Sequence, residues 1–245
     1  MIPLTEFDDR SKVWHLDCAD QWWHLVEQME TKSRYPSVTG ALKELISHCV
    51  AIVSEVPPDT ILFRTRLHSA RNRNEKSQPL TVGQMWEPPP STARGGRLNP
   101  SGIPYLYTAF DPETAVSEMR PWPGAEVTVA RFRVRSSLLV YDLTSIPNTT
   151  SKIHKFVRKM VANAFATPTH PESAYAYGFT QTLSELLKAH GSGNIAGIQY
   201  PSAMRSGGIN LALFGGIYPA FTTVLDGIDA SLHTIDEVSV TTRPS

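Results

Sequence analysis

At 245 residues the chain can form one large domain, or one domain with a substantial extension, and its composition is that of an ordinary soluble globular protein. The formal net charge is zero, with 23 basic and 23 acidic residues, which argues against direct nucleic-acid binding. Two cysteines and eight scattered histidines provide neither a disulfide framework nor metal-ligand spacing, so we expect no metal. The chain begins without a signal sequence and has no run of transmembrane length, so we expect a cytoplasmic protein that does not contact membranes.

The N-terminal region is predicted to be helical. Apolar residues recur at helical spacing over residues 19–30 and again over residues 37–53, and Pro57-Pro58 ends this pair of helices. We therefore separate a helical N-terminal extension, residues 1–57, from a core domain over residues 58–225. Residues 226–245 are polar and weakly patterned, and we expect them to form a C-terminal tail.

The core domain mixes strands and helices in no repeating order, which predicts an α+β fold. Residues 68–104 form a long Arg-, Pro- and Gly-rich connection, and connections of that length are usually functional or disordered. The alternation in residues 127–134 slips in phase near Arg131, which predicts a bulge. Strands are expected at 60–67, 105–109, 127–134, 138–143, 195–200 and 209–214, and helices after Asp111 and over 153–164 and 179–190.

The helix after Asp111 carries the most informative residue of the chain. Asp111 is expected to be its N-cap, with Pro112 at the first helical position. Glu118 then falls on the apolar face of this helix, where a carboxylate requires either a partner or a chemical role. The structural alternative is an ion pair with a nearby arginine: Arg120, Arg131 or Arg133.

Further candidates lie on the first core strand, in the glycine-flanked loop, and near the C-terminus. Arg64 shares one strand face with Arg66, and the alternation does not separate the two. Taken singly, each candidate also has a structural interpretation: a strand-end arginine reaches solvent, and Arg97 caps a turn. On the same structural interpretation, Tyr107 would be a core residue, and Ser202 would be a turn residue after proline.

Taken together in order, these motifs resemble the RES domain, a family named after an arginine, a glutamate and a serine. The pattern comprises Phe63-Arg64, Gly-Gly-Arg97-Leu-Asn-Pro-x-Gly-x-Pro-x-Leu-Tyr107, Thr-Ala-x-x-Glu118, and Gly-Ile-x-Tyr-Pro-Ser202 followed by Gly-Gly-x-Asn210-Leu-x-Leu-Phe. The resemblance covers roughly residues 58–216. It is specific because separate motifs recur in the same order.

The resemblance implies a fold similar to the ADP-ribosyltransferase toxins, a mixed sheet with flanking helices. It implies an NAD+-degrading bacterial toxin that cleaves the bond between nicotinamide and ribose, with phosphate or water as acceptor and with no cofactor. The implied partner is a helix-turn-helix antitoxin, and a homodimer within that complex is one arrangement it allows. Carried over, the naming triad is Arg64, Glu118 and Ser202, while Arg97, Tyr107 and Asn210 match further active-site and substrate-binding positions.

The residue chemistry fits this reaction independently. Glycosidases usually need two carboxylates, because a poor leaving oxygen must be protonated. Nicotinamide in NAD+ is already cationic and departs neutral, so one carboxylate, Glu118, suffices to stabilise the oxocarbenium-like transition state. Arginines suit the pyrophosphate because their planar forks bind phosphate oxygens. Tyr107 is suited to stacking on nicotinamide or ribose, and Ser202 either bonds the ligand or orients Glu118.

Two other functions remain open at this point. One is transfer of ADP-ribose to a protein, although neither Glu113 nor Glu126 makes the E-x-E arrangement frequent in such transferases. The other is a non-catalytic binding module with a RES-like fold.

Some of the chain departs from the family pattern. Residues 1–57 have no counterpart that we can assign, and residues 68–96 are expanded, as a lid over the site would be. Within that connection, Trp86 either belongs to a rigid proline-rich stretch or is presented to adenine.

Overall fold

A computed structural model describes residues 52–68, 78–145, 152–167, 177–190, 194–215 and 221–238, together with His24, Glu27, Gln28, Thr31 and Lys32. The expected α+β fold is confirmed, since an eight-stranded mixed sheet carries a few helices. The expected N-terminal helices lie almost wholly outside the described residues. The strands are β1 (Val53–Val56), β2 (Ile61–Leu67), β3 (Tyr105–Ala109), β4 (Glu126–Val134), β5 (Leu138–Asp142), β6 (Ile195–Pro201), β7 (Ile209–Phe214) and β8 (Leu225–Thr234).

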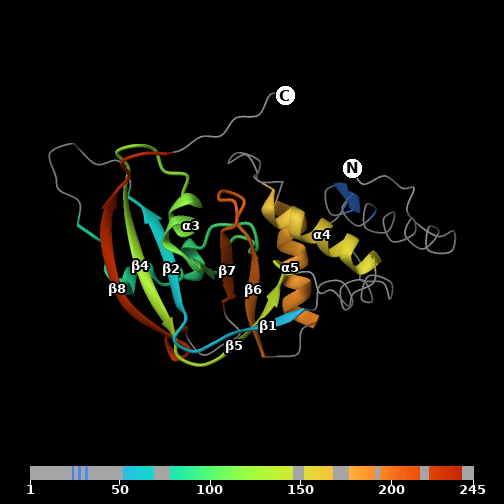
Figure 1. Cartoon of the computed structure of the whole chain (residues 1–245). Helices are drawn as coiled ribbons and strands as arrows, with labels where there is room; N and C mark the ends of the chain where they lie inside the picture. Colours follow the sequence, from blue (N-terminus) through green and yellow to red (C-terminus); the bar gives the residue numbers. More distant parts are fainter. Residues whose placement is uncertain are drawn as a thin grey trace.

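The sheet has the strand order β1-β5-β6-β7-β3-β2-β4-β8, so the first and the last described strands of the chain form its two edges (Figure 1). Among the described strands, β5 and β6 form the parallel pair and the other neighbours are antiparallel. The bulge expected near Arg131 is confirmed, because the register of β4 with β8 shifts between Arg131 and Phe132. The unpaired residue at this point is Ile228, so the bulge lies on β8.

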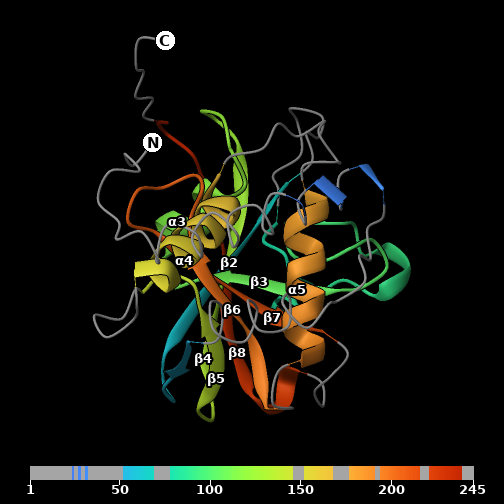
Figure 2. The ribbon, with the colours of Figure 1, turned by 90° about the vertical axis from the view of Figure 1, so that its right-hand side faces the viewer.

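Each face of the sheet buries its own apolar layer. Helices α4 (Lys152–Ala166) and α5 (Gly178–His190) cover one face over β5, β6 and β7, as seen in Figures 1 and 2. The opposite face packs against the connection around η2 (Val82–Met85), which contributes Met85 and Trp86. Because Met85 and Trp86 pack on the sheet, the expected long connection has a structural role in its described part. Two further short 3-10 helices are η3 (Pro90–Thr92) and η5 (Phe221–Thr223).

Strands β2 and β3 separate soon after they meet. Their register contains the single pair Phe63 with Ala109, whereas β2 pairs with β4 along its whole length. The guanidinium of Arg64 lies in this opening, and its Nη1 donates a 3.0 Å hydrogen bond to the carbonyl oxygen of Tyr107 on β3. A side chain thus satisfies a strand carbonyl that a neighbouring strand would otherwise pair.

The helix α3 (Pro112–Ser117) begins as expected. The carboxylate of Asp111 accepts hydrogen bonds from the backbone N–H and the hydroxyl of Thr114, at 2.8 and 2.7 Å, and Pro112 occupies the first turn. Glu118 is the C-cap, and Arg120 adopts a left-handed backbone conformation with φ of 48°. Glycine is the usual residue at such a helix end, so an arginine in this conformation marks local strain.

Two parts of the expected domain organisation are wrong. Residues 226–234 belong to β8 rather than to a tail, because they pair with β4 and extend the sheet. Residues 53–56 belong to β1 rather than to a helix, because they pair with β5 at the other edge. In both cases the partner strand supplies the backbone hydrogen bonds, and the local sequence pattern does not predict a strand.

Candidate active site

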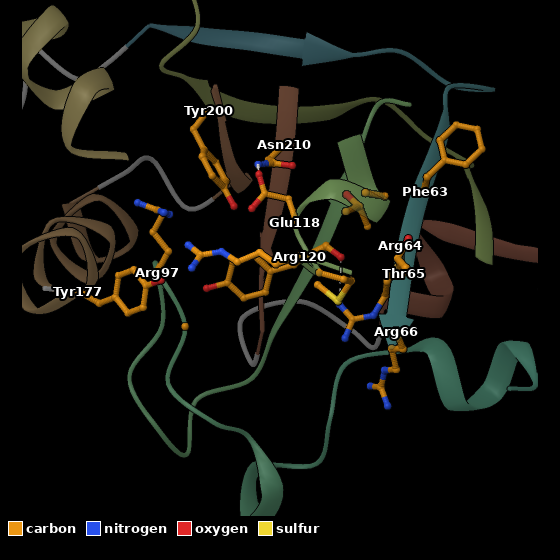
Figure 3. Close-up of a pocket in the computed structure, with 15 residues that line it drawn as sticks. Phe63, Arg64, Thr65, Arg66, Arg97, Glu118, Arg120, Tyr177, Tyr200 and Asn210 are labelled. Atoms are coloured by element: carbon orange, nitrogen blue, oxygen red, sulfur yellow. Dashed lines mark hydrogen bonds between the residues drawn. The ribbon is translucent and has the colours of Figure 1, made fainter. Parts of the chain in front are cut away.

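A cavity of about 650 Å³ lies where β2 and β3 separate, next to α3. Figure 3 shows Arg97 and Tyr177 at one end and Arg64 and Arg66 at the other, with Glu118 between them. Its volume falls in the range that accommodates cofactor-sized ligands. The lining residues are Phe63, Arg64, Thr65, Arg66, Gly96, Arg97, Tyr107, Thr108, Ala115, Glu118, Met119, Arg120, Tyr177, Tyr200 and Asn210.

Glu118 is held in place by two side chains, one from the turn after β6 and one from β7. Its Oε1 accepts hydrogen bonds from Nδ2 of Asn210 at 2.6 Å and from Oγ of Ser202 at 2.7 Å. No described residue donates a hydrogen bond to its Oε2. One carboxylate oxygen is therefore used for positioning, and the other is available to a ligand in the cavity.

Ser202 lies behind the cavity wall and does not line it. Its Oγ donates to Glu118 and also accepts from the backbone N–H groups of Met204 and Arg205, at 3.1 and 3.0 Å. These contacts fix the direction of the serine hydroxyl. Of the two roles considered from the sequence, the geometry supports orientation of Glu118.

Arg64 and Arg66 lie on the same face of β2, as alternation predicts, and both line the cavity. Arg64 is the more deeply buried, and its Nε has no hydrogen-bond partner among the described residues. Burial lowers the pKa of the Arg64 guanidinium to about 10, and the charge of Arg66 acts in the same direction. Arg66 Nη2 donates to the carbonyl oxygen of Trp86 at 2.9 Å. An anion bound here would offset the cost of burying the Arg64 charge.

Tyr107 supports the loop that carries Arg97. Its hydroxyl donates to Oδ1 of Asn99 at 2.6 Å and accepts from the backbone N–H of Leu98 at 3.0 Å. Gly96 passes so close that an added Cβ would lie 2.7 Å from both Asn99 Oδ1 and the Tyr107 hydroxyl oxygen. Glycine is thus required at position 96, because the backbone passes close to the Asn99 and Tyr107 side chains. The hydrogen bonds of Tyr107 set the position of the loop.

Arg97 is anchored at the helical end of the cavity. Its guanidinium lies 5.3 Å from the centre of the Tyr177 ring, and its Nη1 donates to the carbonyl oxygen of Thr167, just beyond α4. The loop backbone is fixed by α5, where Thr180 and Gln181 donate to the carbonyl oxygens of Arg97 and Gly96. These contacts present the arginine on a rigid support.

Five of the six predicted site residues line one cavity, namely Arg64, Arg97, Tyr107, Glu118 and Asn210. The predicted sixth, Ser202, reaches it through Glu118. The alternative ion pair of Glu118 with Arg131 is not formed, because Arg131 pairs with Asp229.

The sequence interpretation missed Tyr177 and Tyr200, and it considered Arg120 only as an ion-pair partner. Tyr200 lies within the Gly-Ile-x-Tyr-Pro-Ser202 motif and could have been found there, whereas nothing local marks Tyr177. Presentation of Trp86 to adenine is wrong. Its ring packs edge-on against Phe132, with centroids 4.7 Å apart, in the core on the opposite face.

A comparison with protein-family models finds the RES domain over residues 62–234. No curated protein matches this chain. The match spans β2 to β8 and therefore every residue of the cavity. It associates the chain with NAD+-related enzymatic activity of a toxin-like module. Within the described part of the chain, no helix is long and apolar enough to cross a membrane.

Proposed function

Because the chain belongs to the RES domain family, we propose that it is a toxin that degrades NAD+ by cleaving the bond between nicotinamide and ribose. The observation that carries this proposal is the state of Glu118. One carboxylate oxygen is fixed by Ser202 and Asn210, and the other is left for a ligand in a cavity rich in arginine. Such a fixed charge stabilises a developing oxocarbenium ion without reorganising during the reaction.

Among the described residues that line the cavity, Glu118 is the single carboxylate, and the absence of a second one there fits the leaving group. An oxygen leaving group would need a general acid, but nicotinamide leaves NAD+ as a neutral molecule from a cationic nitrogen. The same absence disfavours transfer of ADP-ribose to a protein, a reaction in which a second acidic group commonly orients the acceptor. Glycosidic cleavage with a small acceptor is the function that this geometry supports best.

The charges of the cavity favour phosphate over water as that acceptor. Four arginines line it, namely Arg64, Arg66, Arg97 and Arg120, against the single carboxylate of Glu118. The pyrophosphate of NAD+ would engage part of this positive charge through bidentate contacts. The remainder would attract a phosphate ion to the ribose carbon from which nicotinamide departs.

The proposal also includes a partner. A helix-turn-helix antitoxin would keep the enzyme inactive until it is released, and the cytoplasm is the compartment where NAD+ would be consumed. The activity should therefore be measured on purified protein whose molecular mass, determined by native mass spectrometry, shows that no partner is bound.

The first test is incubation with NAD+, with and without phosphate, with the products identified by NMR. Free nicotinamide with ADP-ribose 1″-phosphate means phosphorolysis, and free ADP-ribose means hydrolysis. If no nicotinamide is released in either condition by partner-free protein, the proposal is wrong and a binding module becomes the better interpretation.

The second test is Glu118→Gln, which keeps the shape of the side chain but removes its charge. We expect turnover to fall at least about a hundredfold while NAD+ binding persists, because the charge acts mainly in the transition state. Glu113→Gln, on the exposed side of α3, is the matched control and should retain activity. Turnover in Glu118→Gln equal to that of the control would refute the assigned role.

A further inference from the structure

Tyr200 occupies a position beside Glu118 that its place in the sheet explains. It is the register partner of Asn210 on the neighbouring strand, and directly opposed residues share one face. Because the Asn210 amide bonds Glu118, Tyr200 lies next to the same carboxylate. Figure 3 shows its hydroxyl end directed toward Glu118 in the cavity.

The ring of Tyr200 is fixed, while its hydroxyl is unused. The residue is only 5% exposed, and its ring packs 6.0 Å from that of Phe165 between the sheet and α4. No described residue forms a hydrogen bond with its hydroxyl. The other buried tyrosines of this cluster are satisfied, since Tyr105 donates to Glu185 at 2.8 Å and Tyr141 to the carbonyl oxygen of Leu187 at 3.2 Å.

A buried tyrosine hydroxyl usually has a partner, so this exception at a cavity wall points to a group supplied by the ligand. Burial raises the pKa of Tyr200, and the nearby Tyr107 and Glu118 raise it further. The hydroxyl consequently stays protonated and remains a donor at neutral pH. Next to it, the free Oε2 of Glu118 is an acceptor.

We propose that Tyr200 is a substrate-binding residue that acts as a pair with Glu118 on the ribose next to nicotinamide. The Tyr200 hydroxyl donates to one of the two adjacent ribose hydroxyls, and Oε2 of Glu118 accepts from the other. This inference rests on the proposed function, and it adds the group that the pair recognises. Because the two side chains together bind both hydroxyls of a vicinal diol, they favour a ribose over a deoxyribose.

The test combines Tyr200→Phe with three substrates: NAD+ and its analogues lacking either the 2′- or the 3′-hydroxyl of the nicotinamide ribose. Removing the tyrosine hydroxyl should lower kcat/KM for NAD+ about tenfold, the loss expected for one hydrogen bond of this type. Wild-type enzyme should discriminate against both analogues. Tyr200→Phe should no longer discriminate against the analogue that lacks the partner of Tyr200.

Tyr141→Phe is the matched control, because it removes a buried hydroxyl from the same apolar cluster without touching the cavity. It should keep the substrate preferences of wild type. If Tyr200→Phe keeps full activity, or if it discriminates against both analogues as wild type does, the pairing is overturned while the proposed function stands. If wild-type protein neither binds NAD+ nor releases nicotinamide, both proposals fail together.

Discussion

The hydroxyl of Ser202 donates a 2.7 Å hydrogen bond to Oε1 of Glu118 across 84 positions of the chain. Two backbone N–H groups of the following turn point at the same serine oxygen, so its proton is directed toward the carboxylate. The turn after β6 thereby determines the orientation of a side chain at the end of α3. Ser202 is a positioning residue, which explains how it contributes to the site without lining the cavity.

Ser202→Ala should therefore lower kcat about tenfold and leave KM for NAD+ nearly unchanged. Asn210 still holds Glu118 in this variant, but one of two restraints on its orientation is lost. Steady-state kinetics of nicotinamide release measures this effect. In the Glu118→Gln background the serine has no carboxylate to orient, so the double variant should be no slower than Glu118→Gln alone. A second tenfold loss in that background would mean that Ser202 acts on the substrate directly.

Gly96→Ala should disrupt the loop that presents Arg97. The added methyl group would lie 2.7 Å from the Asn99 and Tyr107 oxygens, so the loop must shift, and such overpacking costs about 1–3 kcal/mol. We expect a lower free energy of unfolding in urea together with weaker NAD+ binding. Gly83→Ala is the control, since the nearest atom to its added Cβ, Thr81 Oγ1, is 3.8 Å away. Wild-type stability and affinity in Gly96→Ala would show that the close approach is unimportant.

Asp111 should make stability depend on pH in the acid range. Burial alone would raise its pKa, but the hydrogen bonds from Thr114 and the charge of Arg205 outweigh it and hold the pKa below its ordinary value. The ionised form is thus favoured in the folded state, so its contribution is complete above the unfolded pKa of about 3.9 and is lost as pH falls through the lower folded value.

Asp111→Ala should consequently cost about 1 kcal/mol at neutral pH, the typical value of an N-cap, and less as the pH drops below about 4. Urea unfolding of both proteins between pH 7 and pH 3 measures the difference. Asp111→Asn, which keeps a neutral cap, should show no such pH-dependent contribution from this position. A difference between wild type and Asp111→Ala that stays constant or grows on acidification would contradict the assignment.

Local signals made much of the core predictable. Asp111-Pro112 specifies a helix start by hydrogen bonding and by a fixed φ, and the apolar runs of β3 and β7 have the length of buried strands. β8 was not predictable in this way, because it carries Asp226, Gly227 and Asp229 on an edge strand. Its pairing with β4 and the ion pairs of its aspartates with Arg135 and Arg131 compensate for weak strand propensity.

The candidate site divides in the same manner. Glu118 was identifiable because an inward carboxylate on an apolar helix face is costly, and the motif order indicated its companions. The direction of each contact was not identifiable, since it depends on strand register. Tyr200 neighbours Glu118 only because β6 pairs with β7 so that Tyr200 faces Asn210. Tyr177 reaches the cavity through the packing of α5, which no local pattern reports.

The opening between β2 and β3 has a consequence for the molecule as a whole. Because β2 and β3 share one register pair, Phe63 with Ala109, the sheet consists of two parts, β1-β5-β6-β7-β3 and β2-β4-β8, that are joined at this pair. Next to it, the Arg64 side chain spans the opening and bonds the carbonyl oxygen of Tyr107. The cavity is lined by β2 on one side of the opening and by β3, β6 and β7 on the other, so a ligand bound there would add contacts that join the two parts of the sheet.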